Sequence, residues 1–171
     1  MGCAKIEVLV YTEREERSKV MEDVIYVYTD GGARGNGDDN CLSAWAYTLQ
    51  YGEHHKESYK AYVGKTNNQM EMQAIIEALK AIKNKDIPIR LHSDSNYCIQ
   101  GITSWIHGWK KKNWINSQKK PVENKELWIE MDKLVSECKD IKFIKVKGHA
   151  DVEGNIRVDL LVNKAMDEYH E

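Results

Sequence analysis

Length, composition and charge place the chain among ordinary globular proteins. It has 171 residues, of which 42% are hydrophobic and 30% charged, and its formal net charge is −2. That length suits one domain and leaves no room for a second. No apolar run approaches the ~20 residues that a membrane span needs, and the N-terminus lacks a signal-peptide pattern. We therefore expect a cytoplasmic protein without membrane association.

The first part of the chain predicts strands. A strand-like stretch at 6–12 is followed by a charged run, and we interpret it as an added edge strand or a contact for self-association. Val24 to Thr29 is β-branched and aromatic, which is typical of a strand buried on both faces. Two more strands, at 43–51 and 56–63, follow through glycine-containing turns. The three consecutive strands from Val24 onward predict an antiparallel meander.

The second part alternates helix and strand. A helix is expected from Met70 to Lys83, a strand from Ile89 to Ser93, and two or three helices up to Cys138. A strand at 141–146 and a last helix from Val158 to Tyr169 complete the order. This pattern predicts an α/β fold with a mixed sheet and helices packed on it.

Four carboxylates stand out at the ends of apolar segments. Asp30 ends the strand before the Gly31-Gly32 turn, and Asp94 ends the Ile89 strand. Glu71 and Asp159 lie at helical spacing from the buried stripes of their helices, so both are expected to look inward. Any one of these acids alone is better explained as a cap, a turn residue or half of an ion pair. Four together predict a shared site.

The chemistry of that site points to a hard divalent cation. Buried carboxylates need compensating positive charge, and no Lys or Arg is placed in the sequence to neutralise all four. Carboxylate ligands suit Mg²⁺, with Mn²⁺ as a substitute, whereas the Cys and His ligands that Zn²⁺ prefers are missing from the neighbouring positions.

With these residues in place, the chain resembles type 1 ribonuclease H, in particular the bacterial form with a basic protrusion. The resemblance runs from Val24 to Tyr169 and implies a five-stranded mixed sheet with helices on both faces. It divides the chain into an N-terminal extension, residues 1–23, and a catalytic domain, residues 24–171. The motifs that carry the resemblance are YTDGGARGNG, TNNQMEMQAIIEAL, HSDSNYCIQGITSWIHGWKKKNW, KKPVENKELW and VKGHADVEGNIRVDLLVNKA.

The resemblance also implies an activity. It identifies Asp30, Glu71, Asp94 and Asp159 with the family's metal-binding carboxylates, and His149 of the KGHA segment with its catalytic histidine. Two Mg²⁺ ions, ~4 Å apart, would bridge the scissile phosphate. The implied reaction is hydrolysis of the RNA strand of an RNA/DNA hybrid, which leaves 5′-phosphate and 3′-hydroxyl ends.

A basic, tryptophan-rich segment is the expected grip on the nucleic acid. Lysines in such a run are often a solvated helix face, and Trp105 and Trp109 follow a helical stripe that could merely brace a helix hairpin. A local basic patch is nevertheless what a net acidic enzyme needs in order to hold phosphates. The candidate substrate contacts in this segment are Trp105, Lys110, Lys111, Lys112, Trp114, Lys119 and Lys120.

Amide side chains flank the acids and are the expected readers of RNA. Each could instead be a turn or cap residue, Asn67 above all. As a group they resemble the family's polar contacts to the minor groove, where 2′-hydroxyls identify RNA. They are Asn36, Asn67, Asn68, Gln69 and Asn96.

Two rival functions remain open on the sequence. The same fold with an acidic site serves integrases and transposases, which transfer DNA strands but use fewer acids at other spacings and lack the KGHA loop. A catalytically silent hybrid-binding module would be expected to have lost an acid. The expected partner is an RNA/DNA hybrid, and we expect a monomer unless residues 1–23 mediate self-association.

Overall fold

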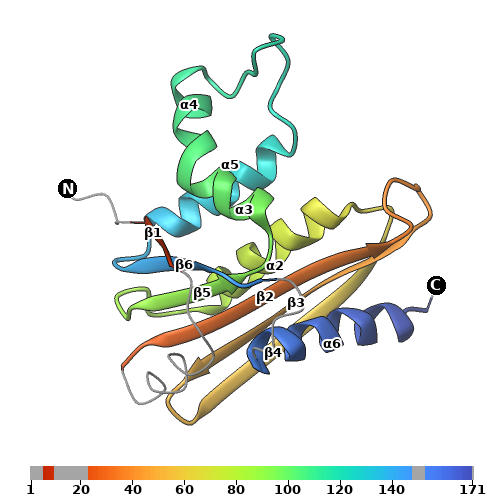
Figure 1. Ribbon diagram of the computed structural model, residues 1–171, viewed down its shortest axis with the longest axis vertical. Coiled ribbons are helices and arrows are strands. Elements are labelled where there is room, and N and C mark those ends of the chain that lie inside the picture. The colour runs from red at the N-terminus through yellow and green to blue at the C-terminus, as the bar shows by residue number, and fades with distance from the viewer. Residues whose placement is uncertain (1–5, 10–22, 148–152, 171) are drawn as a thin grey trace.

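The computed structural model describes residues 6–9, 23–147 and 153–170, which build one mixed sheet with helices on both faces (Figure 1). The strands are β1 (Ile6–Leu9), β2 (Ile25–Arg34), β3 (Leu42–Tyr51), β4 (His54–Val63), β5 (Ile89–Ser93) and β6 (Ile141–Lys145). The helices are α2 (Asn67–Ala81), α3 (Asn96–Gln100), the π-helical turn η1 (Gly101–Trp105), α4 (Ile106–Lys111), α5 (Lys125–Ser136) and α6 (Glu153–Asp167).

The sheet confirms the expected fold class and adds one strand to it. β2, β3 and β4 are antiparallel neighbours, and β5 and β6 continue the sheet in parallel on the other side of β2. These are the five strands of the expected mixed sheet. β1 pairs in parallel with the outer edge of β6, with Ile6 opposite Ile141, so the full order is β1-β6-β5-β2-β3-β4.

Each face of the sheet has its own apolar core, because successive side chains of a strand point to opposite faces. On β3, Trp45 and Tyr47 belong to the core beneath α2 and α5, whereas Ala44 and Ala46 belong to the core beneath α6. α6 therefore covers the face opposite α2 and α5 (Figure 1). The small alanine side chains leave room for α6 to pack closely on β3.

The helices between β5 and β6 form an outward projection. α3, η1 and α4 follow one another without a break and carry the chain away from the sheet (Figure 1). Gly101 begins the π-helical turn, where a Cβ atom would lie 2.0 Å from the ring of Trp128 on α5. Among the described residues, no helix is both long and apolar enough to cross a membrane.

Candidate metal centre and nucleic-acid cleft

Asp30 lies inside β2, and the prediction that it ends the strand is wrong. β2 continues to Arg34, and Asp30 pairs with Ala46 of β3. The expected Gly31-Gly32 turn is instead extended strand. A Cβ atom on Gly31 would lie 2.3 Å from the backbone nitrogen of Glu71, so glycine is what allows α2 to approach the strand. This close approach brings Glu71 beside Asp30.

Glu71 is placed by the start of α2. The helix begins at Asn67, three residues before the predicted start, because Thr66 and Gln69 form a reciprocal capping box. The Thr66 hydroxyl accepts from the Gln69 amide at 3.1 Å, and the Gln69 side chain accepts from the Thr66 amide at 3.0 Å. Glu71 then falls on the second turn, facing the sheet, and is only 9% exposed. Its inward direction agrees with the prediction.

Asp94 directly follows β5, as predicted. Ser95 caps α3 by accepting a hydrogen bond from the Cys98 amide, which holds Asp94 between a strand end and a helix start. The ammonium group of Lys145 on β6 donates to the backbone carbonyl of Asp94. One carboxylate oxygen from each of Asp30, Glu71 and Asp94 lies within 4.8 Å of the other two.

Burial and neighbouring negative charge raise the pKa of two carboxyl groups in this cluster, those of Asp30 and Glu71. Burial, followed by the charge of Asp94, raises the pKa of Asp30 from 3.8 to about 7. Burial and then Asp30 raise the pKa of Glu71 well above 4.5. Glu71 Oε2 is fully buried and has no hydrogen-bond partner among the described residues. Apposed carboxylates with an unsatisfied oxygen are the environment in which a divalent cation supplies the missing positive charge. The three residues could therefore hold a metal ion.

Asp159 lies apart from this cluster. We expected its side chain to look toward the core, but it is exposed, and the buried residue of that turn of α6 is Val158. Successive residues of a helix point ~100° apart, so burial of Val158 turns Asp159 toward the surface. Asp159 still lines the same open cleft as the three clustered acids. The volume of this cleft is about 600 Å³.

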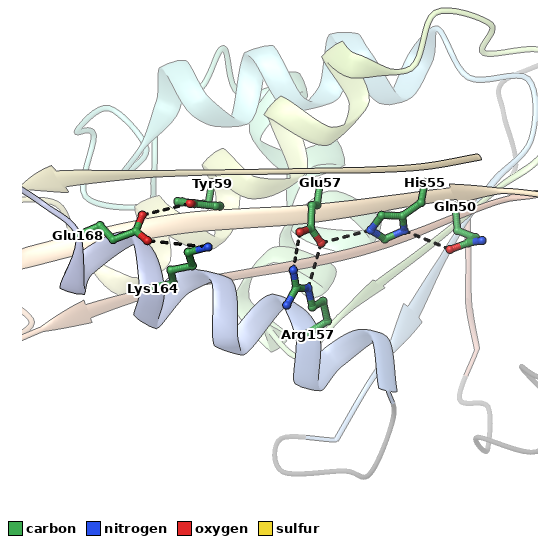
Figure 2. A network of polar contacts seen from close by, with 7 residues as sticks. All are labelled: Gln50, His55, Glu57, Tyr59, Arg157, Lys164 and Glu168. Atoms are coloured by element: carbon green, nitrogen blue, oxygen red, sulfur yellow. Dashed lines mark hydrogen bonds and ion pairs between the residues drawn. The ribbon is translucent and has the colours of Figure 1, made fainter. Parts of the chain in front are cut away.

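α6 is fixed on the sheet by polar contacts with β4 (Figure 2). Arg157 donates two hydrogen bonds to Glu57, at 2.6 and 3.0 Å, and His55 contacts the same carboxylate at 3.2 Å. The Arg157 hydrogen bonds lower the pKa of Glu57 from 4.5 to about 2. Near the other end of the helix, Tyr59 donates to Glu168 at 3.1 Å. These contacts join α6, which carries Asp159, to β4 in addition to the apolar packing of α6 on Ala44 and Ala46.

The five amide residues divide into two groups. Asn68 and Asn96 are exposed and line the cleft. Asn36, Asn67 and Gln69 make hydrogen bonds within the protein: Asn67 accepts from Ala33 at 2.6 Å, its backbone amide donates to Asn36 at 3.0 Å, and Gln69 belongs to the capping box. Asn67 is neither a turn residue nor the cap of α2, which is Thr66; its side chain joins the start of α2 to β2, and it also lines the cleft.

The basic segment is built on a cluster of aromatic rings that pack at tilted angles. The Trp109 ring lies 6.0 Å from that of Trp105, 6.3 Å from that of Trp114 and 5.4 Å from that of Trp128 on α5. These contacts support the bracing interpretation for Trp105 and Trp109, while Trp105 remains 42% exposed.

The candidate lysines are not equivalent. Lys110 is exposed but forms an ion pair of 2.7 Å with Asp132 of α5, so it also ties α4 to that helix. The other four candidate lysines are also exposed: Lys111, Lys112, Lys119 and Lys120.

Several cleft residues escaped the sequence analysis. Arg34, Ser95, Tyr97 and Asn163 line the cleft with the acids. The available signal was weak: Arg34 is the single basic residue of the YTDGGARGNG motif, and Asn163 lies one helical turn after Asp159. His149, the predicted catalytic histidine, lies outside the described residues.

A buried carboxylate cluster at the floor of an open polar cleft, on a mixed sheet covered by helices, defines a class of proteins that use divalent cations on phosphate esters. The sequence comparisons identify the family. The profile of the RNase H family matches residues 22–167. The chain belongs to the ribonuclease H family.

Individual relatives agree with this assignment. The chain is 49% identical over 147 residues to ribonuclease H of Clostridium botulinum, a match that covers 85% of this chain and 97% of that protein. It is 44% identical over 144 residues to ribonuclease H of Ruthia magnifica, covering 84% and 96% of the two chains.

Solved structures show the same fold. LC9-RNase H1, described as a type 1 RNase H with the type 2 active-site motif, superposes with a TM-score of 0.75 at 25% identity, covering 85% of this chain and 72% of that one. LC11-RNase H1, solved in complex with an RNA/DNA hybrid, gives a TM-score of 0.62 at 26% identity, covering 84% and 97%.

Proposed function

We propose that this ribonuclease H hydrolyses phosphodiester bonds in the RNA strand of RNA/DNA hybrids. The observation that carries the proposal is the cluster of Asp30, Glu71 and Asp94 under an open cleft, in a chain that belongs to this family. The complex of the related LC11-RNase H1 with an RNA/DNA hybrid supports the choice of substrate.

Mg²⁺ is the proposed cofactor, with Mn²⁺ as a substitute. The donor set consists of carboxylate oxygens, which suit these hard cations, and Glu71 Oε2 is a buried oxygen without a partner among the described residues. Asp159 is the proposed fourth ligand, from the rim of the cleft. When bound, two such ions supply an activated water and stabilise the leaving 3′-oxygen.

The residues of the chain have separate tasks in this scheme. The four carboxylates hold positive charge at the cleaved phosphate and do not themselves attack it. His149, in its glycine-flanked KGHA segment, is the proposed proton carrier, because an imidazole titrates near neutral pH. The products carry 5′-phosphate and 3′-hydroxyl ends.

Recognition of the two strands is assigned to two different parts of the surface. Asn68 and Asn96 are exposed beside the acids, where an amide can donate to or accept from a 2′-hydroxyl. The exposed lysines of the α4 projection hold the DNA strand through its phosphates. An enzyme of this specificity acts where hybrids form, so we propose a cytoplasmic monomer.

The test is a DNA strand with a short internal block of ribonucleotides, annealed to complementary DNA. Incubation with Mg²⁺ should cut only within the block or at its edge, and EDTA should stop the reaction. All-DNA duplex and unpaired RNA serve as controls and should be poor substrates. Cuts spread through the deoxy flanks would favour an integrase-like nuclease, and binding without cuts would favour a silent hybrid-binding module.

A further inference from the structure

The cleft contains one cation that the proposed function does not use. Among the described residues that line the cleft, Arg34 is the one basic side chain, alongside Asp30, Glu71, Asp94 and Asp159. A polyanionic substrate that enters an acidic cleft is repelled wherever bound cations do not offset the charge. Arg34 therefore lies where a phosphate most needs a partner.

Arg34 lies well away from the carboxylate cluster. It is the last residue of β2, four residues after Asp30, which is ~13 Å along an extended strand. Asp30, Gly32 and Arg34 point to the same face of the sheet, because every second residue of a strand shares a face. Arg34 is thus placed to meet a phosphate of the strand being cut that flanks the scissile phosphate.

The backbone under Arg34 is fixed, while its side chain is held only by exposed partners. The neighbouring Ala33 amide donates to Asn67 at 2.6 Å. The Arg34 guanidinium forms an ion pair with Asp167 at 2.8 Å, with the two side chains 44% and 65% exposed, and it donates to the Asn163 side chain at 3.3 Å. Exposed ion pairs of this kind are weak and exchange readily.

We propose that Arg34 is a phosphate-binding residue, which exchanges Asp167 and Asn163 for a backbone phosphate of the RNA strand when the hybrid enters the cleft. The guanidinium group presents paired donors that match two phosphate oxygens, and a backbone phosphodiester carries the same single negative charge as the exposed carboxylate that it would replace. When no substrate is bound, the Arg34 side chain pairs with Asp167 at the end of α6. This inference rests on the proposed function, because it takes the hybrid as the ligand.

The experiment measures binding of a labelled RNA/DNA hybrid by fluorescence anisotropy in EDTA, so that no cleavage occurs, over a range of salt concentrations. Arg34→Gln should weaken binding roughly 3- to 10-fold and reduce the log-log salt slope by ~0.9, the value for one lost phosphate contact on duplex DNA. Arg34→Lys should keep the slope and lose part of the affinity, since it retains the charge but not the paired donors.

Asp167→Asn is the matched control, because it breaks the same ion pair from the other side. This substitution removes the ion pair and leaves Arg34 only its hydrogen bonds to Asn163, so binding should be unchanged or tighter, with the slope of the wild type. The inference is overturned if Arg34→Gln leaves the slope unaltered. It is also overturned if Asp167→Asn weakens binding as much as Arg34→Gln, since the pair would then only clamp α6 to β2. A wild type that binds the hybrid but never cuts it would refute the proposed function alone.

Discussion

Asp30 and Glu71 are carboxyl groups that the fold buries before any cation is bound, and Asp94 adds its charge to both. The charge of Asp94 thus raises the pKa of both buried acids, Asp30 also raises that of Glu71, and the metal-free protein carries electrostatic strain at this point. Two predictions follow from that strain, one for a substitution and one for pH.

Asp94→Asn should abolish cleavage while leaving the protein as stable as the wild type or more stable. The substitution removes a proposed metal ligand, but it also removes a negative charge that opposes ionisation of Asp30 and Glu71. We expect a gain on the order of 1 kcal/mol in the free energy of unfolding of the metal-free protein. Hybrid cleavage and thermal unfolding measure the two effects. Asp86→Asn, at an exposed residue outside the cluster, is the control that should change neither. Near wild-type turnover of Asp94→Asn in Mg²⁺ would sink the metal-site assignment.

The metal-free protein should lose stability as the pH rises through the acid range toward neutrality. The pKa of Asp30 is 3.8 in an unperturbed chain and about 7 in the folded protein. Between these values the folded protein keeps a proton that the unfolded chain has released, so the free energy of unfolding falls with increasing pH. Across this range the free energy of unfolding should fall by on the order of a few kcal/mol, and saturating Mg²⁺ should offset the loss.

Urea unfolding in EDTA at pH 5, 6, 7 and 8 measures this dependence, and Asp30→Asn should reduce it to the part that buried Glu71 contributes. Glu57 provides a contrast of opposite sign. Its pKa is lowered from 4.5 to about 2, so its stabilising effect is present above pH 4.5 and is lost as the pH falls. Glu57→Gln should therefore leave the slope between pH 5 and 8 intact. A wild-type stability that stays flat from pH 5 to 7 in EDTA would contradict the pKa of Asp30.

At the scale of elements, the outward projection formed by α3, η1 and α4 carries two kinds of lysine. One kind forms an ion pair within the protein, and the other faces solvent. Lys110 is paired with Asp132, whereas Lys111 and Lys112 are exposed at the end of α4. Lys111→Ala combined with Lys112→Ala should weaken hybrid binding and flatten its salt slope by ~0.9 per lost contact, with little change in turnover at saturating substrate.

Two single variants, one tested by its melting temperature and one by its salt slope, sharpen the lysine prediction. Lys110→Ala should lower the melting temperature slightly through loss of the Asp132 ion pair. Lys83→Ala, at an exposed residue just beyond the C-terminal end of α2, should leave the slope unchanged because it lies away from the cleft. If the Lys111 and Lys112 variant keeps the wild-type slope, these lysines are only a solvated helix face.

The elements also show where sequence reasoning succeeds and where it stops. The strand from Ile89 to Ser93 and the buried stripe of α2 were predicted correctly, because both depend on local apolar patterns. Asp30 was misplaced because Gly31-Gly32 signals a turn locally, while the structure needs glycine for contact with a helix forty residues later. The exposure of Asp159 depends on how α6 rests on Ala44 and Ala46, a contact that helical periodicity alone does not contain.

At the scale of the whole molecule, the sheet has two unequal edges. Among the described strands, β1 lies at one edge and pairs with β6, which separates it from β5, the strand that Asp94 follows (Figure 1). The family match begins at residue 22, after β1. Every described residue that lines the cleft lies beyond the N-terminal extension.

Deletion of residues 1–22 should leave kcat/KM for the hybrid within ~3-fold of the full chain, because every described residue that lines the cleft lies after residue 22. The same deletion removes β1, so the backbone N–H and C=O groups on the side of β6 that faces β1 lose their partners. An uncovered edge strand is a template for pairing with another chain. Light scattering across a concentration series should thus show a monomer for the full chain and increasing self-association for the truncated one. If the truncated protein stays monomeric while the full chain dimerises, β1 is instead the contact for self-association. If kcat/KM falls more than tenfold while the sheet stays intact, the extension reaches the cleft.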